Sequence, residues 1–111
     1  MVDTVQLFKC LSDETRLNTT LLIYRQEKLC VCELVEALQV SQPKMSRHLA
    51  QLRNCGLLED SRNGQWVFYS LKKSLPNWMK NILDITATAN NTSLKAYEKN
   101  LKSMRSRPNY C

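Results

Sequence analysis

The fold of this chain is constrained most by two short amphipathic stretches that follow one another in the sequence and are separated by a tight polar turn. The first is predicted over 30–38, because its apolar residues recur at helical spacing and Glu33 stands where the return partner of a capping box would stand. The second is predicted over 42–54, with Ser41 as its N-cap and Gly56 as a C-terminal cap in the left-handed conformation. Two short helices joined this tightly predict a helix-turn-helix unit.

A β-hairpin is predicted directly after this unit. Strands are expected over 57–60 and 66–71, and the residues between them include Asn63-Gly64. Both of these residues tolerate positive φ, which makes the pair a strong hairpin signal. A helix-turn-helix followed by a hairpin, with Arg62 near the tip, predicts a winged helix-turn-helix.

The remaining segments predict helices on either side of the unit. An apolar stretch over 5–11 predicts a first helix, and a second is expected from the cap at Ser12-Asp13-Glu14 through about Arg25. Pro76 opens a long amphipathic helix, in which the polar run 90–93 is a candidate interruption. The expected fold class is therefore mainly α with a small β-hairpin.

Composition narrows the class of protein. Sixteen Lys and Arg against ten Asp and Glu give a net charge of +6, which favours an anionic partner such as nucleic acid. The longest apolar run, 21–24, is too short to cross a bilayer, so no membrane partner is expected. No secretory signal is visible, and five cysteines then predict reduced thiols in a cytoplasmic protein. We expect one domain over 1–103 and a flexible basic tail over 104–111.

The outer face of the second helix carries the polar and basic side chains expected to read DNA. A recognition helix presents its N-terminal half to base edges in the major groove, and its free backbone N–H groups can hold a phosphate. The alternative is a solvated basic face with no nucleic-acid partner. The predicted DNA-contacting residues are Ser41, Gln42, Lys44, Ser46, Arg47, His48, Gln51 and Arg62.

The same residues resemble a known family. The resemblance is carried by Leu7–Lys9, Leu11–Leu17, Leu29–Leu34, Ser41–Leu49, Gly56–Leu58 and Gly64–Tyr69. Over about residues 5–85 the chain resembles the ArsR/SmtB repressors, above all their arsenical-responsive members. The resemblance implies a winged-helix homodimer, formed by the first and last helices, that binds double-stranded operator DNA and leaves it when As(III) or Sb(III) binds thiolates. No other cofactor is implied.

Cys30 and Cys32 are the candidate ligands for such an ion. A thiolate at a helix N-terminus is stabilised by the helix dipole, which lowers its pKa, and soft thiolates suit thiophilic ions. Residues two apart on a regular helix point about 200° apart, so one ion can bind both only where the helix start unwinds or is irregular. An unwinding start would distort the reading unit and release DNA.

The family pattern often has a third cysteine where this chain has Val35. The missing ligand is then a small thiol or Cys10, Cys55 or Cys111 from either chain, and binding by two thiolates is the alternative. The alternative interpretation of Cys10 and Cys55 is structural, because a free cysteine packs as a small apolar side chain.

More apolar surface is predicted than one small winged helix can cover. The first helix and the helix after Pro76 both carry apolar stripes, and self-association is their natural use. The predicted dimerisation residues are Val5, Phe8, Trp78, Ile82 and Ile85.

Three other readings are weighed against this one. An enzyme is not expected, because His48 is the one histidine and lies in the DNA-reading helix, which leaves a reactive cysteine without a base. A redox, persulfide or Cd/Pb sensor would use some of the same thiols, and a constitutive DNA-binding protein would use none.

An interhelical zinc site is not expected, because the last helix lacks histidine. Gln39 stands where the turn commonly has Gly, which predicts a slightly strained turn.

Overall fold

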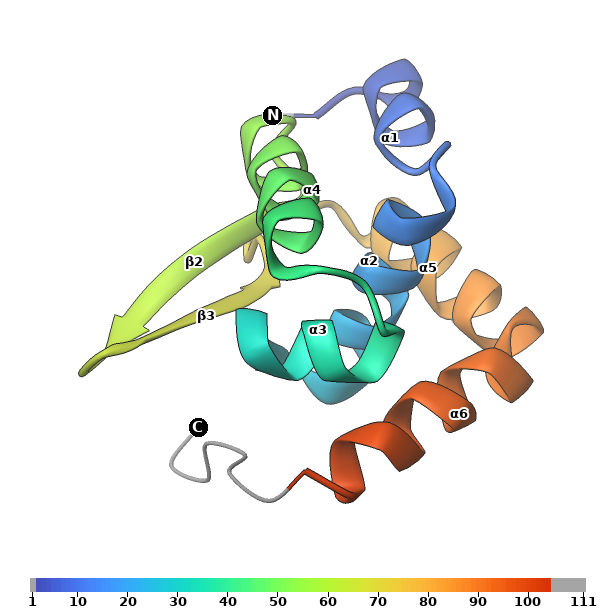
Figure 1. Ribbon diagram of the computed structural model, residues 1–111. Coiled ribbons are helices and arrows are strands. Elements are labelled where there is room, and N and C mark those ends of the chain that lie inside the picture. The colour runs from blue at the N-terminus through green and yellow to red at the C-terminus, as the bar shows by residue number, and fades with distance from the viewer. Residues whose placement is uncertain (1, 105–111) are drawn as a thin grey trace.

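The computed structural model describes residues 2–104 and folds this part of the chain as six helices and a small antiparallel sheet (Figure 1). Cys111 and all of the predicted tail except Met104 lie outside the described residues. The elements are α1 (Thr4–Cys10), α2 (Glu14–Gln26), β1 (Lys28–Cys30), α3 (Val31–Leu38), α4 (Gln42–Asn54), β2 (Leu58–Asn63), β3 (Trp66–Leu71), α5 (Asn77–Ala89) and α6 (Asn91–Lys102).

The helix-turn-helix formed by α3 and α4 is confirmed, together with its caps. The backbone N–H of Cys30, the N-cap of α3, donates to Glu33 Oε1 at 2.9 Å. Gln39 closes the helix in the left-handed conformation, with φ 57° and ψ 46°. Ser41 caps α4 by accepting a hydrogen bond from the Lys44 amide at 3.3 Å, and Gly56 follows the helix with φ 92°.

The sheet has one strand more than the sequence predicts. β1 pairs antiparallel with β3, so the strand order is β1-β3-β2. The helix predicted over 30–38 begins one residue later, at Val31, because Cys30 ends β1. A strand of three residues is too short to show a measurable alternation in the sequence. The hairpin is also longer than predicted, because β2 continues through the expected turn to Asn63, which faces Trp66 across the pair.

The predicted interruption of the C-terminal helix is confirmed. α5 and α6 are separate helices that meet at Asn90, whose backbone has φ −110° and ψ 24°. The side-chain amide of Asn90 donates to the Thr86 carbonyl at 2.8 Å, and such a side-chain bond to the backbone competes with helix continuation.

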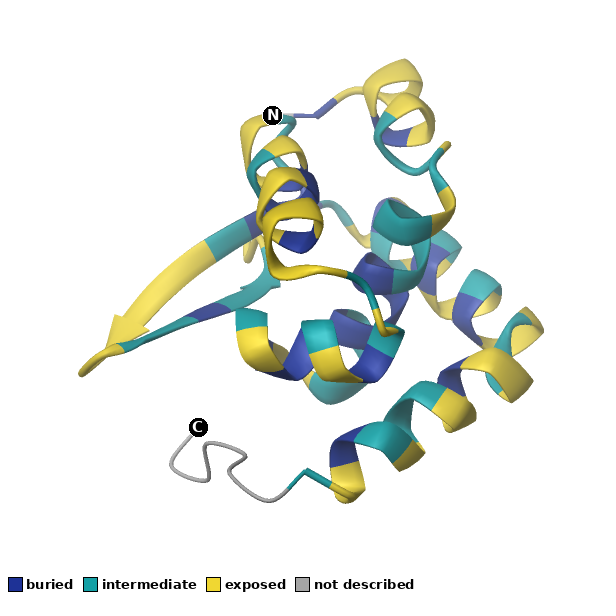
Figure 2. Cartoon of the chain, in the orientation of Figure 1, coloured by how far each residue is buried: buried dark blue, intermediate teal, exposed yellow. Residues whose placement is uncertain are grey.

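The hydrophobic core is built around α2, which contacts α3, α4, α5, α6, β1 and β3. Leu21, Leu22 and Ile23 of this helix are fully buried. The hairpin of β2 and β3 projects away from this core, and the distal part of β2 and one side of α4 are exposed (Figure 2). Within residues 2–104, no helix is long and apolar enough to span a membrane.

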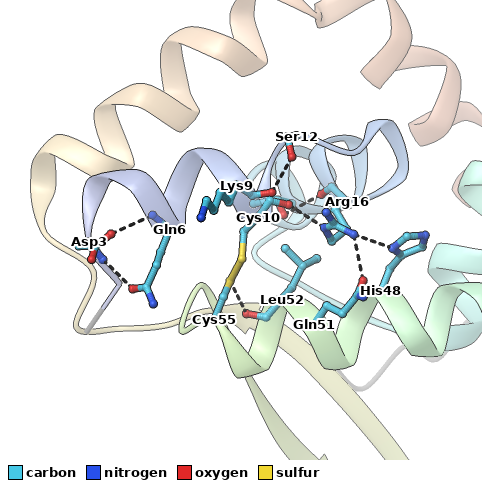
Figure 3. Close-up of a disulfide and its surroundings, with 11 residues drawn as sticks. Asp3, Gln6, Lys9, Cys10, Ser12, Arg16, His48, Gln51, Leu52 and Cys55 are labelled. Atoms are coloured by element: carbon cyan, nitrogen blue, oxygen red, sulfur yellow. Dashed lines mark hydrogen bonds between the residues drawn. A yellow bond between two sulfur atoms is a disulfide. The ribbon is translucent and has the colours of Figure 1, made fainter.

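Cys10 and Cys55 form a disulfide between the end of α1 and the end of α4 (Figure 3). The prediction that all the thiols are reduced is therefore wrong for this pair in the structure. The two residues are 45 positions apart, and only the packing of α1 beside the C-terminal end of α4 brings their sulfurs together. Neither sulfur of this disulfide is available as a thiolate ligand.

Candidate nucleic-acid interface and thiol site

One side of α4 is buried and the other is open to solvent. Met45, Leu49 and Leu52 have no exposed surface, as their helical spacing predicts. The sequence of this described helix has no acidic residue, so its open side is uniformly basic or neutral. The predicted DNA-contacting residues on and beside α4 that are exposed are Ser41, Gln42, Lys44, Ser46, Arg47 and Gln51.

The prediction that His48 faces solvent or DNA is wrong. His48 is only 7% exposed, and its ring lies against α2. It stands three residues after Met45 and four before Leu52, so the helical period itself places it on the buried side. Its polarity, rather than its position, led to the wrong assignment.

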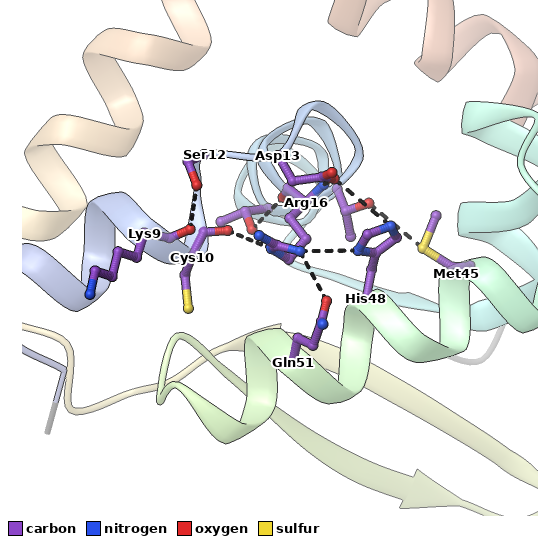
Figure 4. A network of polar contacts seen from close by, with 10 residues as sticks. Lys9, Cys10, Ser12, Asp13, Arg16, Met45, His48 and Gln51 are labelled. Carbon is purple, nitrogen blue, oxygen red and sulfur yellow. Dashed lines mark hydrogen bonds and ion pairs between the residues drawn. The ribbon is translucent and has the colours of Figure 1, made fainter.

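Arg16 of α2 explains why a histidine can occupy this buried position (Figure 4). Its Nε donates to the carbonyl of Cys10 at 2.8 Å, and its Nη1 donates to Gln51 Oε1 at 2.9 Å and lies 3.4 Å from His48 Nδ1. His48 Nε2 lies 3.8 Å from Asp13 Oδ2, and the Arg16 amide is the main reason that the pKa of Asp13 is lowered. The contacts of Arg16 therefore join α1, α2 and α4.

The positioning role of Arg16 was not predicted from the sequence. The available signal was an arginine in the first turn of α2, shortly after the acidic residues Asp13 and Glu14. Because the guanidinium holds both the end of α1 and the outer edge of α4, it fixes the orientation of the predicted reading helix.

The hairpin forms the second part of the predicted DNA surface. Arg62 is exposed near its tip and faces Val67 across the strand pair. Arg53 Nη1 lies 3.3 Å from Asp60 Oδ2, so an exposed ion pair links α4 to β2. The reading helix and the wing are therefore in direct contact.

Cys30 and Cys32 lie together at the start of α3. Their Sγ atoms are 3.0 Å apart, although the side chains of a regular helix would diverge at this spacing. The reason is that Cys30 is extended, with φ −93° and ψ 170°, because it is the last residue of β1. Of the two predicted routes to joint binding, the irregular helix start is therefore the one observed, and no unwinding is needed.

The pKa of the Cys30 thiol is raised, which corrects the prediction that the helix dipole lowers it. Cys30 is only 2% exposed, and burial disfavours its charged form; the adjacent Cys32 thiol adds to the effect. The Glu33 amide acts in the opposite direction but is outweighed. Cys32 is exposed, so the pair has one buried and one accessible sulfur.

A cavity of about 350 Å³ opens beside this thiol pair. It lies between the start of α3, the start of α4 and β3, and its wall includes Val35, Gln42, Trp66 and Val67 as well as both thiols. Among residues 2–104 no group of three or more His, Cys, Asp or Glu is placed to hold a metal ion. The pair therefore offers two sulfur ligands beside a mainly apolar wall.

The predicted dimerisation residues are largely uncovered. Val5 and Phe8 of α1 are 63% and 52% exposed, and Trp78 and Ile85 of α5 are 44% and 70% exposed. Ile82 is half-buried and packs against the core instead. Large apolar side chains on two helices are therefore left uncovered in the single chain.

A basic reading helix held in a helix-turn-helix and followed by an antiparallel wing defines a winged-helix DNA-binding protein. Residues 13–60 match the family model "Bacterial regulatory protein, arsR family". The chain is 52% identical over 108 residues to the arsenic resistance transcriptional regulator ArsR2 of Pseudomonas putida strain KT2440. The matched segment covers 97% of this chain and 94% of that protein.

Two further proteins agree with this match. The chain is 47% identical over 97 residues to the arsenical resistance operon repressor of Escherichia coli K12, covering 87% of this chain and 83% of that protein. The crystal structure of the transcriptional regulator HlyU from Vibrio vulnificus superimposes with a TM-score of 0.68 and 33% identity, covering 77% of this chain and 84% of that one. The chain belongs to the ArsR family of arsenical-resistance transcriptional repressors, which are DNA-binding regulators and not enzymes.

Proposed function

We propose that this repressor binds operator DNA as a homodimer and is released when As(III) or Sb(III) binds Cys30 and Cys32. The observation that carries the proposal is the 3.0 Å separation of the two sulfurs. Thiolate–metal bonds are about 2.3 Å long, so sulfurs this close would subtend about 80° at a bound ion. Pyramidal trivalent arsenic holds its ligands at wider angles, so binding pushes the two sulfurs apart.

This displacement acts on both parts of the predicted DNA surface. Cys30 pairs with Phe68 of β3, so it shares the sheet with the wing. Gln42, the first residue of α4, lines the same cavity as the two thiols. A ligand bound to the sulfurs therefore changes how the wing and the reading helix are placed relative to each other.

The proposed DNA contacts are those of the exposed predicted residues. Lys44 and Arg47 provide positive charge on α4, and Arg62 provides it on the wing. The N-terminal turn of α4 and Ser41 approach a phosphate, which fixes the helix in the major groove. His48 contributes by packing against Arg16 and not by touching bases.

The test follows fluorescence anisotropy of a promoter duplex while arsenite or antimonyl tartrate is added. The expected result is release by the wild-type protein and retention by Cys30→Ser and Cys32→Ser, all three binding DNA equally well without inducer. Cys55→Ser controls for the loss of a cysteine away from the thiol pair. Because this variant also opens the Cys10–Cys55 disulfide, its inducer response is compared with that of the reduced wild-type protein. Retention of DNA by the wild-type protein at saturating inducer would refute the proposal.

Dimerisation is tested separately by sedimentation. We expect the wild-type chain to sediment as a dimer through α1 and α5, because a two-fold interface buries the same apolar patch on both copies. Ile85→Glu, at a position that is 70% exposed in one chain, is expected to give a folded monomer that binds DNA at least tenfold more weakly. A wild-type monomer at operator-binding concentrations would refute this part.

A redox response is the second candidate function, and the Cys10–Cys55 disulfide favours it. Hydrogen peroxide would take two electrons and two protons from the two thiols, which gives one disulfide and two waters. If peroxide, but not arsenite, changes operator affinity, and Cys10→Ser abolishes the response, this function replaces the first. A response to Cd(II) with none to arsenite would favour a divalent-ion sensor instead.

A further inference from the structure

We infer that the thiol site is built for monosubstituted organic arsenicals, R–As(III), with their carbon substituent in the adjacent cavity. This inference rests on the proposed function, because it names the chemical class of ligand for the same two thiols. It goes beyond that function in predicting that an aryl or alkyl arsenical is preferred to inorganic arsenite.

The first argument is the number of ligands. Trivalent arsenic makes three bonds, and inorganic arsenite therefore needs three sulfurs to replace its three oxygens. The structure brings two sulfurs together, and no third His, Cys, Asp or Glu joins them among residues 2–104. An organic arsenical already has one carbon bonded to arsenic, so two sulfurs complete it.

The second argument is the wall beside the sulfurs. Val35 stands three residues after Cys32, on the same side of α3, and lines the cavity with Val67 and Trp66. A cavity of about 350 Å³ is at the small end of the range for small-molecule sites, about 300–1,000 Å³. These apolar side chains favour a hydrocarbon group. The two polar side chains of the lining, Gln42 and Gln65, carry no thiol that could replace a third arsenic-bound hydroxyl.

The binding step balances without an oxidant or a reductant. The hydrated ligand R–As(OH)₂ reacts with the thiols of Cys30 and Cys32; two As–O bonds break and two As–S bonds form. The two thiol protons leave with the two hydroxides as two waters. Arsenic stays trivalent, its bond to carbon is kept, and the group R points into the cavity.

The experiment measures the affinity of the full chain for phenylarsonous acid, methylarsonous acid and arsenite, by equilibrium dialysis with arsenic detection. No thiol reductant is added, because it would compete for arsenic. We expect phenylarsonous acid to bind at least tenfold more tightly than arsenite. The adduct mass should equal protein plus ligand minus two waters, and Cys30→Ser should abolish it.

Two substitutions separate the two arguments. Val35→Cys supplies the third sulfur and is expected to tighten arsenite binding at least tenfold, whereas Val35→Ser, of similar size but without a thiol, should not. Val67→Lys places a charge in the cavity wall and should remove the preference for phenyl over methyl while methylarsonous acid still binds. Circular dichroism of each variant checks that it is folded.

Several results would overturn the inference. The first is that arsenite binds the wild-type chain as tightly as phenylarsonous acid does. The second is that Val35→Cys does not tighten arsenite binding. The third is a tenfold loss of arsenite affinity in Cys111→Ser, which would assign the third sulfur to that residue. If arsenicals bind but DNA is retained, the proposed function fails and the inference stands. If no arsenical binds the thiol pair, both fail.

Discussion

Cys30 pairs with Phe68 across β1 and β3, so the buried thiol belongs to the same sheet as the wing. A helix-capping cysteine that also ends a strand cannot move without moving the hairpin or the start of α3. This relationship couples a thiol site to a DNA-reading surface within one small domain.

The Arg16 side chain is expected to hold the reading helix in place. Arg16→Met removes its hydrogen bonds to the partly buried Cys10 carbonyl and to the exposed Gln51 side chain, and the carbonyl loses this donor. We expect the free energy of unfolding to fall by about 1–3 kcal/mol and operator affinity to fall several-fold. Urea unfolding and anisotropy measure the two effects.

Arg53→Gln is the matched control for this arginine. Arg53 pairs with Asp60 at an exposed site, where the side chains are 46% and 39% exposed. Such pairs contribute about 0–1 kcal/mol, so its effect on stability should be clearly smaller. Equal losses in both variants would contradict the positioning role of Arg16.

Reduction of the Cys10–Cys55 disulfide is expected to destabilise the fold. The bond closes a loop with a sequence separation of 45, and opening it restores chain entropy to the unfolded state. The free energy of unfolding should fall by about 2–4 kcal/mol when a phosphine reductant is added. Cys10→Ser should be as unstable as the reduced protein and indifferent to the reductant; a reductant-sensitive Cys10→Ser protein would contradict the assignment.

The contact of α6 with α2 is expected to weaken in acid. Burial raises the pKa of Glu98, but its hydrogen bonds to Arg25 and Gln26 outweigh this, and the pKa lies below the usual 4.5. A lowered folded pKa gives stability that is present above pH 4.5 and is lost as the pH falls through the folded value.

Glu98→Gln isolates this contribution. Its unfolding free energy should be about 1 kcal/mol lower than that of the wild-type chain at neutral pH, and the difference should shrink steadily below pH 4.5. Thermal unfolding of both proteins between neutral and acidic pH gives the comparison. A difference that is constant with pH would show that the carboxylate charge has no part in it.

Much of the fold could be predicted because its signals are local. The apolar spacing and the caps at Cys30 and Ser41 depend on neighbours within one turn, and both are confirmed. β1 could not be predicted, because a three-residue strand exists only through its pairing with β3. The same holds for the disulfide and for the contacts of Arg16, which join segments far apart in sequence.

The candidate site was predicted in its residues but not in its geometry. The thiol pair could be chosen from its spacing and its place at a helix start. Its sulfur separation and the raised pKa of Cys30 depend on the strand and on burial, which spacing does not reveal. His48 was assigned by its polarity, against the helical period that buries it.

Replacing Gln39 in the turn of the helix-turn-helix is expected to stabilise the fold. Gln39 adopts φ 57°, a left-handed conformation that costs a residue with a side chain about 1 kcal/mol relative to Gly. Its side chain recovers part of this cost by donating to the Glu36 carbonyl at 2.6 Å. Gln39→Gly should therefore raise the free energy of unfolding by about 0.5 kcal/mol, measured by urea unfolding, with operator affinity unchanged. A loss of stability would mean that the side-chain contact outweighs the strain.

The coupling between the thiol pair and the DNA surface is tested most directly by its reciprocity. The dissociation constant of arsenite or phenylarsonous acid, whichever binds more tightly, is measured by dialysis with and without saturating operator duplex. Thermodynamic linkage requires operator to weaken arsenical binding by the factor by which the arsenical weakens operator binding. We predict equal factors of at least tenfold. The same arsenical affinity with and without operator would contradict the account.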